Sequence, residues 1–124
     1  MGYESRIIVA LRRVWEKSDL VWYHKLADMK LSRVSYDFPE IFTTEIESNI
    51  YGDGFKENST EEYELTVDKY GDTCKYADIQ AVIDWLENAE SKEHYRRFTP
   101  AIAMLKAYAA EEWEGDLVVI HYGY

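Results

Sequence analysis

Two stretches of alternating side chains, separated by only four polar residues, constrain the fold most. In residues 6–15, Ile7 and Val9 alternate with Ile8 and Ala10, which predicts a strand. Residues 16–19 suit a hairpin connection to a second strand over residues 20–29. A cluster of aromatic and β-branched residues favours that second strand. A helix remains the alternative, because a helical stripe is also formed by Leu20, Tyr23, Ala27 and Leu31.

Two helices and a buried strand are predicted in the second half of the chain. Residues 77–89 have apolar side chains at helical spacing, and Asp78 lies where the helix dipole favours an anion. Thr99 and Pro100 predict a second helix, with Thr99 as its cap and Pro100 at its first position. Residues 117–122 are apolar enough for a strand inside a sheet, and we expect this strand beside the first one.

The remaining segments give weaker patterns. Pro39 favours a short helical stretch near residues 41–44, and residues 63–68 alternate as a half-buried strand. The predicted class is α+β, as a single domain over residues 1–124. We expect an antiparallel or mixed sheet of about four to five strands with two helices on one face.

Composition excludes several classes of protein. The 124 residues suit one domain, and the aromatic content of 15% argues against a disordered acidic chain. There is no apolar run long enough to span a membrane and no secretory pattern at the start. Cys74 is the sole cysteine, so an internal disulfide is excluded, and we expect a cytoplasmic protein.

The net charge of −10 is concentrated in the middle of the chain. Residues 37–90 contain fifteen acids and three lysines, whereas residues 1–36 are net basic. Such a block creates a negative potential and argues against direct binding to nucleic-acid phosphates. It fits a basic protein partner or a surface that imitates a nucleic acid. The simpler alternative is a solvated face that aids solubility.

Catalytic and metal-binding patterns are weak. No metal-ligand spacing connects Cys74 with the histidines, although Cys74 and His94 flank the first helix and could meet. Asp68, Asp72 and Asp78 lack the order of a calcium loop. Neighbouring carboxylates such as Glu111 and Glu112 point apart. We predict no catalytic residues, no metal, no cofactor and no enzymatic activity, and we expect His121 to be a satisfied core or boundary residue.

A basic cluster offers a second interpretation. His94, Arg96 and Arg97 could hold a nucleotide phosphate while Tyr95 or Trp85 stacks on the base. A pocket lined by Arg12, Arg13, Arg96 or Arg97 and an aromatic residue would make the chain a binder of a nucleotide signal. The simpler alternative is that Arg96 and Arg97 pair with acids of the preceding helix.

Several segments of the chain have a familiar sequence: Met1-Gly2-Tyr3-Glu4-Ser5, residues 70–89, His94-Tyr95-Arg96-Arg97, Trp113 and residues 117–124. In these segments the chain resembles small phage and prophage proteins of Gram-positive bacteria. The resemblance implies a mobile-element setting inside a host bacterial cell. Small acidic proteins of that setting are often inhibitors of host defence, including anti-CRISPR proteins.

The leading hypothesis is an acidic binding protein that covers a basic, nucleic-acid-binding surface of a host defence nuclease such as a CRISPR effector. Carboxylates would replace phosphates, and exposed aromatic residues would anchor the complex. The alternatives are the nucleotide binder and a structural or assembly protein of a virion. A homodimer through the apolar strands is compatible with all three. The expected partner-binding residues are Glu45, Glu47, Tyr51, Asp53, Phe55, Glu57, Glu61, Glu62, Asp68 and Asp72.

Overall fold

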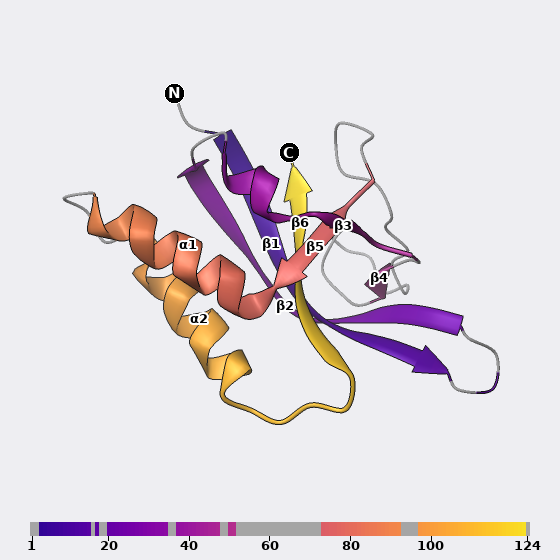
Figure 1. The fold of residues 1–124 in the computed structure, drawn as a ribbon. Coiled ribbons are helices and arrows are strands. Elements are labelled where there is room, and N and C mark those ends of the chain that lie inside the picture. Colours follow the sequence, from indigo (N-terminus) through magenta and orange to yellow (C-terminus); the bar gives the residue numbers. More distant parts are fainter. Residues whose placement is uncertain are drawn as a thin grey trace, which may run out of the picture.

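The computed structural model describes residues 3–15, 17, 20–34, 37–47, 50–51, 73–92 and 97–123. Within these residues the chain forms one sheet, two α-helices and one 3₁₀ turn (Figure 1). The α+β class is confirmed. The elements are β1 (Tyr3–Trp15), β2 (Leu20–Val34), η1 (Phe38–Ile41), β3 (Thr44–Glu45), β4 (Ile50–Tyr51), β5 (Lys75–Asp78), α1 (Ile79–Ser91), α2 (Thr99–Ala109) and β6 (Asp116–Gly123).

The predicted hairpin is present, and its second arm is a strand rather than a helix. β1 and β2 pair in antiparallel fashion along almost their whole length. The register shifts twice, first between Tyr3 and Ser5 and again between Val9 and Ala10. At the second shift Val9 faces Ala27 while Ala10 faces Lys25, and Leu26 is left between them. This β-bulge accounts for the competing helical pattern in the sequence, since an extra residue interrupts the strand period of two. β2 extends to Val34, beyond the predicted end.

The sheet has the strand order β3-β5-β6-β1-β2-β4. As predicted, β6 lies inside the sheet and beside the first strand, with β1 on one side and β5 on the other. All pairs are antiparallel except β2 with β4, so the sheet is mixed. The strand predicted over residues 63–68 lies outside the described residues.

The start of the first helix was predicted two residues too early. Ala77 and Asp78 belong to β5, where they pair with Val119 and Val118 of β6. The backbone of Asp78 is extended, and its carboxylate accepts a hydrogen bond from the backbone N–H of Gln80 at 3.2 Å. Asp78 therefore caps the helix that begins at Ile79, which is the usual role of an aspartate at this position.

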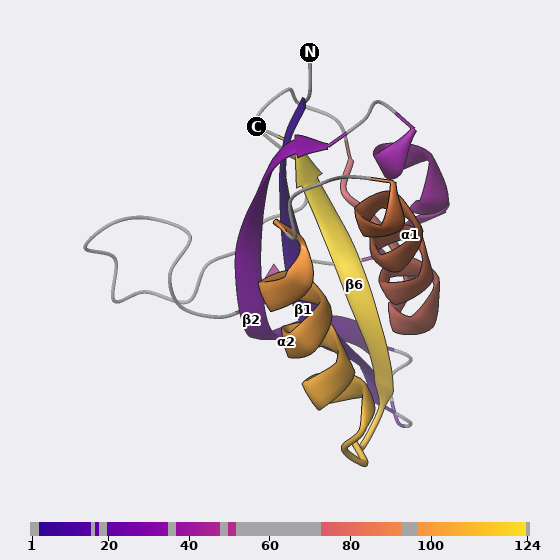
Figure 2. The same cartoon turned by 90° about the vertical axis from the view of Figure 1, so that its left-hand side faces the viewer.

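Both helices cover one face of the sheet, as predicted (Figure 2). The predicted stripe of α1 is buried, and α2 contributes Ala101 and Leu105 to the same cluster. The opposite face has a second apolar cluster around Ile8, Tyr23 and Ile120. The alternation of β1 is thus confirmed, because Ile7 and Ile8 belong to different clusters.

Two predicted details of the helical segments are wrong. Thr99 does not cap α2, because Phe98 occupies the cap position and Thr99 lies inside the helix. The hydroxyl of Thr99 instead donates to Oε1 of Glu90 at 2.7 Å. The short helical stretch lies at Phe38–Ile41, earlier than expected, with Pro39 in its first turn. Residue Thr44, predicted as helical, begins β3.

The buried histidine is satisfied by a neighbour in the sheet. His121 is 8% exposed, and its Nε2 lies 2.8 Å from the hydroxyl oxygen of the buried Ser5. Its ring packs against Phe38 and Phe42, with centroids 5.9 and 5.1 Å away. The prediction of a core role for His121 is confirmed.

Candidate functional site

The structure places only some of the predicted partner-binding residues. Glu45 is exposed in β3, and Glu47 follows that strand. The backbone of Tyr51 belongs to β4, where it pairs with His24 of β2. The other seven predicted residues lie outside the described part of the chain: Asp53, Phe55, Glu57, Glu61, Glu62, Asp68 and Asp72.

The exposed side chain of Glu47 is bound by Arg12 and Tyr23 of the same chain. The Arg12 Nε lies 3.1 Å from both carboxylate oxygens of Glu47, and Nη2 contacts Oε2 as well. The fully buried Tyr23 donates its hydroxyl to Oε1 of Glu47 at 2.9 Å. Glu47 was predicted as a partner contact. In the structure its carboxylate also connects the segment after β3 with Arg12 of β1 and Tyr23 of β2.

This cluster shifts the pKa values of its members. The hydrogen bonds from Arg12 hold the pKa of Glu47 below its ordinary value, and the same contact raises the pKa of Arg12. Burial, followed by the hydrogen bond to Glu47, raises the pKa of Tyr23 to about 12. Tyr23 therefore stays protonated and donates to Glu47 across the physiological pH range.

The Glu47→Gln substitution is expected to lower the free energy of unfolding by about 1 kcal/mol at neutral pH. The value is modest because the Glu47 side chain is 38% exposed. The pKa of Glu47 is depressed from 4.5 in the fold, so its contribution is present above pH 4.5 and is lost as pH falls through the folded-state pKa. Urea unfolding of the wild type and of the Glu47→Gln variant is measured between pH 7 and pH 3, and the two free energies of unfolding should become equal at low pH. Glu45→Gln is the matched control. A difference in free energy of unfolding between wild type and Glu47→Gln that stays constant with pH would contradict a stabilising role of the ionised Glu47.

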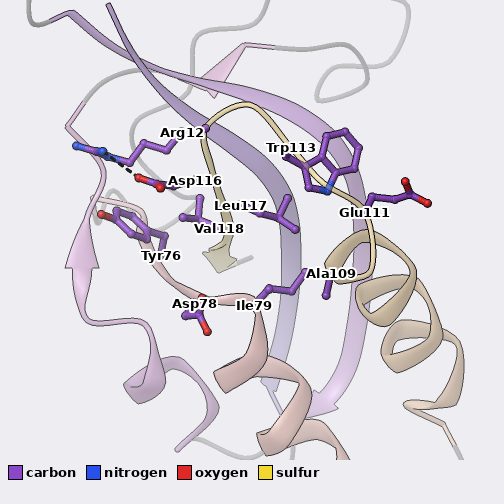
Figure 3. Close-up of a pocket in the computed structure, with 11 residues that line it drawn as sticks. Arg12, Tyr76, Asp78, Ile79, Ala109, Glu111, Trp113, Asp116, Leu117 and Val118 are labelled. Atoms are coloured by element: carbon purple, nitrogen blue, oxygen red, sulfur yellow. Dashed lines mark ion pairs between the residues drawn. The ribbon is translucent and has the colours of Figure 1, made fainter. Parts of the chain in front are cut away.

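A cleft of about 510 Å³ opens at one end of the sheet (Figure 3). It exists because β5 ends at Asp78, opposite Val118, so Asp116 and Leu117 of β6 pair with β1 alone. The C-terminal end of α2 and the segment after it form the far wall. The lining residues are Arg12, Tyr76, Asp78, Ile79, Ala109, Glu111, Trp113, Gly115, Asp116, Leu117 and Val118.

The cleft has an apolar floor and a charged rim. Figure 3 shows Leu117 and Val118 in the middle, Arg12 and Asp116 on one side, and Trp113 with Glu111 on the other. Among the lining residues, Arg12 is the one cation, whereas three carry carboxylates: Asp78, Glu111 and Asp116. The rim is therefore net negative.

The aromatic wall of the cleft is fixed in place. The indole N–H of Trp113 donates to the backbone carbonyl of Tyr108 at 2.8 Å. The two rings also stack, with centroids 5.9 Å apart and an interplanar angle of 28°. Gly115 lets the chain turn back into β6 with a φ of 118°, and a Cβ there would lie 2.8 Å from the carbonyl oxygen of Arg12. The segment after α2 therefore approaches β1 closely.

Arg12 connects the cleft with the predicted acidic block. Besides holding Glu47, its guanidinium lies 3.5 Å from Oδ2 of Asp116. The neighbouring Arg13 lies 3.4 Å from Glu114 and 5.7 Å from the ring centroid of Trp22. Both arginines thus already contact acidic or aromatic side chains of the chain.

Two of the arginines proposed for a nucleotide pocket, Arg12 and Arg97, lie far apart. Arg97 precedes α2 and lies over the ring of Phe98 at 4.8 Å, whereas Arg12 lies at the opposite end of that helix, near Ala109. An 11-residue helix separates the two ends by about 16 Å. Trp85 packs against Phe38, with centroids 4.7 Å apart. The remaining members of the cluster, His94, Tyr95 and Arg96, lie outside the described residues.

In the part of the chain that the structure describes, no three His, Cys, Asp or Glu side chains gather as a metal site would require. Cys74 is buried in the second apolar cluster, and its suggested partner His94 lies outside the described ranges. Neither of the described helices, α1 and α2, is long and apolar enough to cross a membrane.

Sequence reasoning missed the cleft residues of the last quarter of the chain. Glu111, Trp113 and Asp116 belong to a short run in which four acids surround one tryptophan. That run was the available signal, since an aromatic residue among acids is the pattern that suggested Tyr51 and Phe55. It was overlooked because the last third of the chain is nearly neutral as a whole.

Comparison with known proteins gives no match to a protein-family model, to a curated protein or to a solved structure.

Proposed function

We propose that the protein is a binding module that inhibits a host defence nuclease, as anti-CRISPR proteins do, by occupying a basic surface on which the nuclease holds nucleic acid. The supporting observation is the acidic cleft with its fixed tryptophan at one end of the sheet. Carboxylates on such a surface take the place of phosphates against lysine and arginine, and the net charge of −10 attracts a basic partner over long range. The resemblance to phage proteins supports the host-defence setting.

The charge of the cleft disfavours the nucleotide-binding alternative. A phosphate would face three carboxylates and one guanidinium that already contacts Glu47 and Asp116. Burying an anion there without a free cation costs free energy. The virion-assembly alternative has no such conflict and becomes an outcome of the test.

The test is competition between the chain and nucleic acid for a recovered partner. The immobilised chain is exposed to bacterial lysate at about 50 mM and about 500 mM salt, since exposed charges are screened at the higher concentration. We expect a basic nuclease to bind at low salt only, and the chain to displace labelled DNA or RNA from the purified nuclease and to inhibit cleavage. A ternary complex with nucleic acid would contradict the proposal. Recovery of the chain alone would favour the assembly role.

A further inference from the structure

We propose that the cleft between β6, α1 and α2 is a receptor for a single arginine side chain of the basic partner. This inference rests on the proposed function for the identity of the partner. The existence of the receptor can nevertheless be tested on the purified chain. The cleft residues come from three separate parts of the chain, which are Arg12, residues 76–79 and residues 109–118.

The shape and lining of the cleft suit a side chain that is apolar along its length and charged at its end. Its volume of about 510 Å³ lies within the range of roughly 300–1,000 Å³ typical of small-ligand sites. Leu117, Val118 and Ile79 supply apolar surface for the aliphatic part of an arginine. Long basic side chains bury such stems while their charged ends remain near polar groups.

The charge of the rim selects a cation. Asp78 and Glu111 are exposed, and the side chain of Asp116 is 74% exposed although it contacts Arg12. The carboxylates of Glu111 and Asp116 therefore remain accessible to a ligand from solution, whereas the carboxylate of Asp78 caps α1 and adds its negative charge to the rim. The guanidinium of Arg12 is shared between Glu47 and Asp116, so it neutralises only part of this charge.

The tryptophan favours arginine over lysine. Trp113 is held by its hydrogen bond to Tyr108 and by stacking on that ring, so its indole is already ordered before a ligand arrives. A planar guanidinium stacks on an aromatic face and binds a carboxylate through two parallel hydrogen bonds, whereas an ammonium is a compact, strongly hydrated charge. Glu111 lies on the same side of the cleft as Trp113. Its exposed carboxylate points outward in Figure 3, and rotation of this side chain would bring it to a guanidinium stacked on the indole.

The experiment titrates the purified chain with the capped peptide acetyl-Gly-Arg-Gly-amide and follows the indole N–H resonance of Trp113 by NMR. The resonance is assigned with the Trp113→Phe variant. We expect saturable binding in the millimolar range, binding by the lysine peptide at least about threefold weaker, and no binding by the neutral citrulline peptide. Equal binding of citrulline or lysine, or tighter binding of adenosine monophosphate, would overturn the proposal.

Two charge variants locate the site. Glu111→Gln is expected to weaken arginine binding about tenfold. Glu112→Gln makes the same charge change one residue away, outside the cleft lining, and is expected to have little effect. Equal losses of arginine binding in both variants would indicate general electrostatic attraction and overturn the site.

If the partner competes with nucleic acid but the arginine peptide does not shift the indole N–H resonance of Trp113, the arginine receptor is ruled out and the proposed function stands. If the peptide binds but no basic nuclease is recovered, the receptor stands and the proposed partner fails.

Discussion

Replacing Phe38 with alanine is expected to lower the free energy of unfolding by about 3–5 kcal/mol. Phe38 is fully buried, and its ring packs against Phe42 at 5.2 Å, Trp85 at 4.7 Å and His121 at 5.9 Å between centroids. The alanine would leave a cavity where η1 closes over the sheet and α1. Because the total stability of such a domain is about 5–15 kcal/mol, the variant would be close to unfolded at physiological temperature.

The measurement is urea unfolding followed by tryptophan fluorescence and circular dichroism. Val14→Ala is the control, because Val14 is 46% exposed and its truncation should change the free energy by less than about 0.5 kcal/mol. An unfolding midpoint for Phe38→Ala that matches the control would show that η1 does not contribute to the core in solution.

Neutralising Glu61, Glu62, Asp68 and Asp72 together is expected to slow association with the nuclease about tenfold or more at low salt. The four acids belong to the predicted acidic block, and their attraction would speed the encounter with a basic groove. The salt dependence of the association rate should flatten in the same variant, because fewer charges remain to be screened. Stopped-flow or surface-based kinetics over a range of salt concentrations measures both effects.

The matched control neutralises four other acids of residues 37–90 that are not among the expected partner-binding residues. Asp37 and Glu40 are exposed at the start of and within η1, Asp84 and Glu87 are exposed on α1, and their substitution by the corresponding amides changes the net charge equally. We expect the control to slow association less than the block variant does. Equal rates for the two variants would mean that net charge alone attracts the partner. If the variant with Glu61, Glu62, Asp68 and Asp72 neutralised still inhibits the nuclease as strongly as the wild type, these four acids do not belong to the interface.

The sequence predicted the elements whose patterns are local. The β1–β2 hairpin, the buried stripe of α1 and the inner position of β6 each follow from the periodicity of one segment. β5 escaped prediction because it has only four residues and runs directly into α1. A strand so short has no measurable period, and its pairing with β6 is a tertiary feature.

The site was less predictable than the fold for a similar reason. Arg12 and Glu47 are 35 positions apart, and nothing in either neighbourhood indicates the other. The cleft is formed because β5 ends opposite Val118 and leaves the first residues of β6 without a partner on that side. The residues that line the cleft therefore become neighbours only through the register of the sheet. The acids in the middle of the chain are recognisable from the sequence because they are close together in it. The shorter acidic run over residues 111–116 forms part of a site only because the fold places it near Arg12 and Asp78.

The inner position of β6 has a consequence for how the chain folds as it is made. Ser5 of β1 and His121 of β6 are hydrogen-bond neighbours in the sheet although they are 116 positions apart. The inward edges of β1 and β5 therefore have no partner until residues 116–123 have left the ribosome. Closing so long a loop is slow, and until it closes the unpaired strand edges are prone to pair with other chains. A nascent chain of this protein thus reaches its native sheet in one late step, and shorter products are candidates for aggregation and proteolysis.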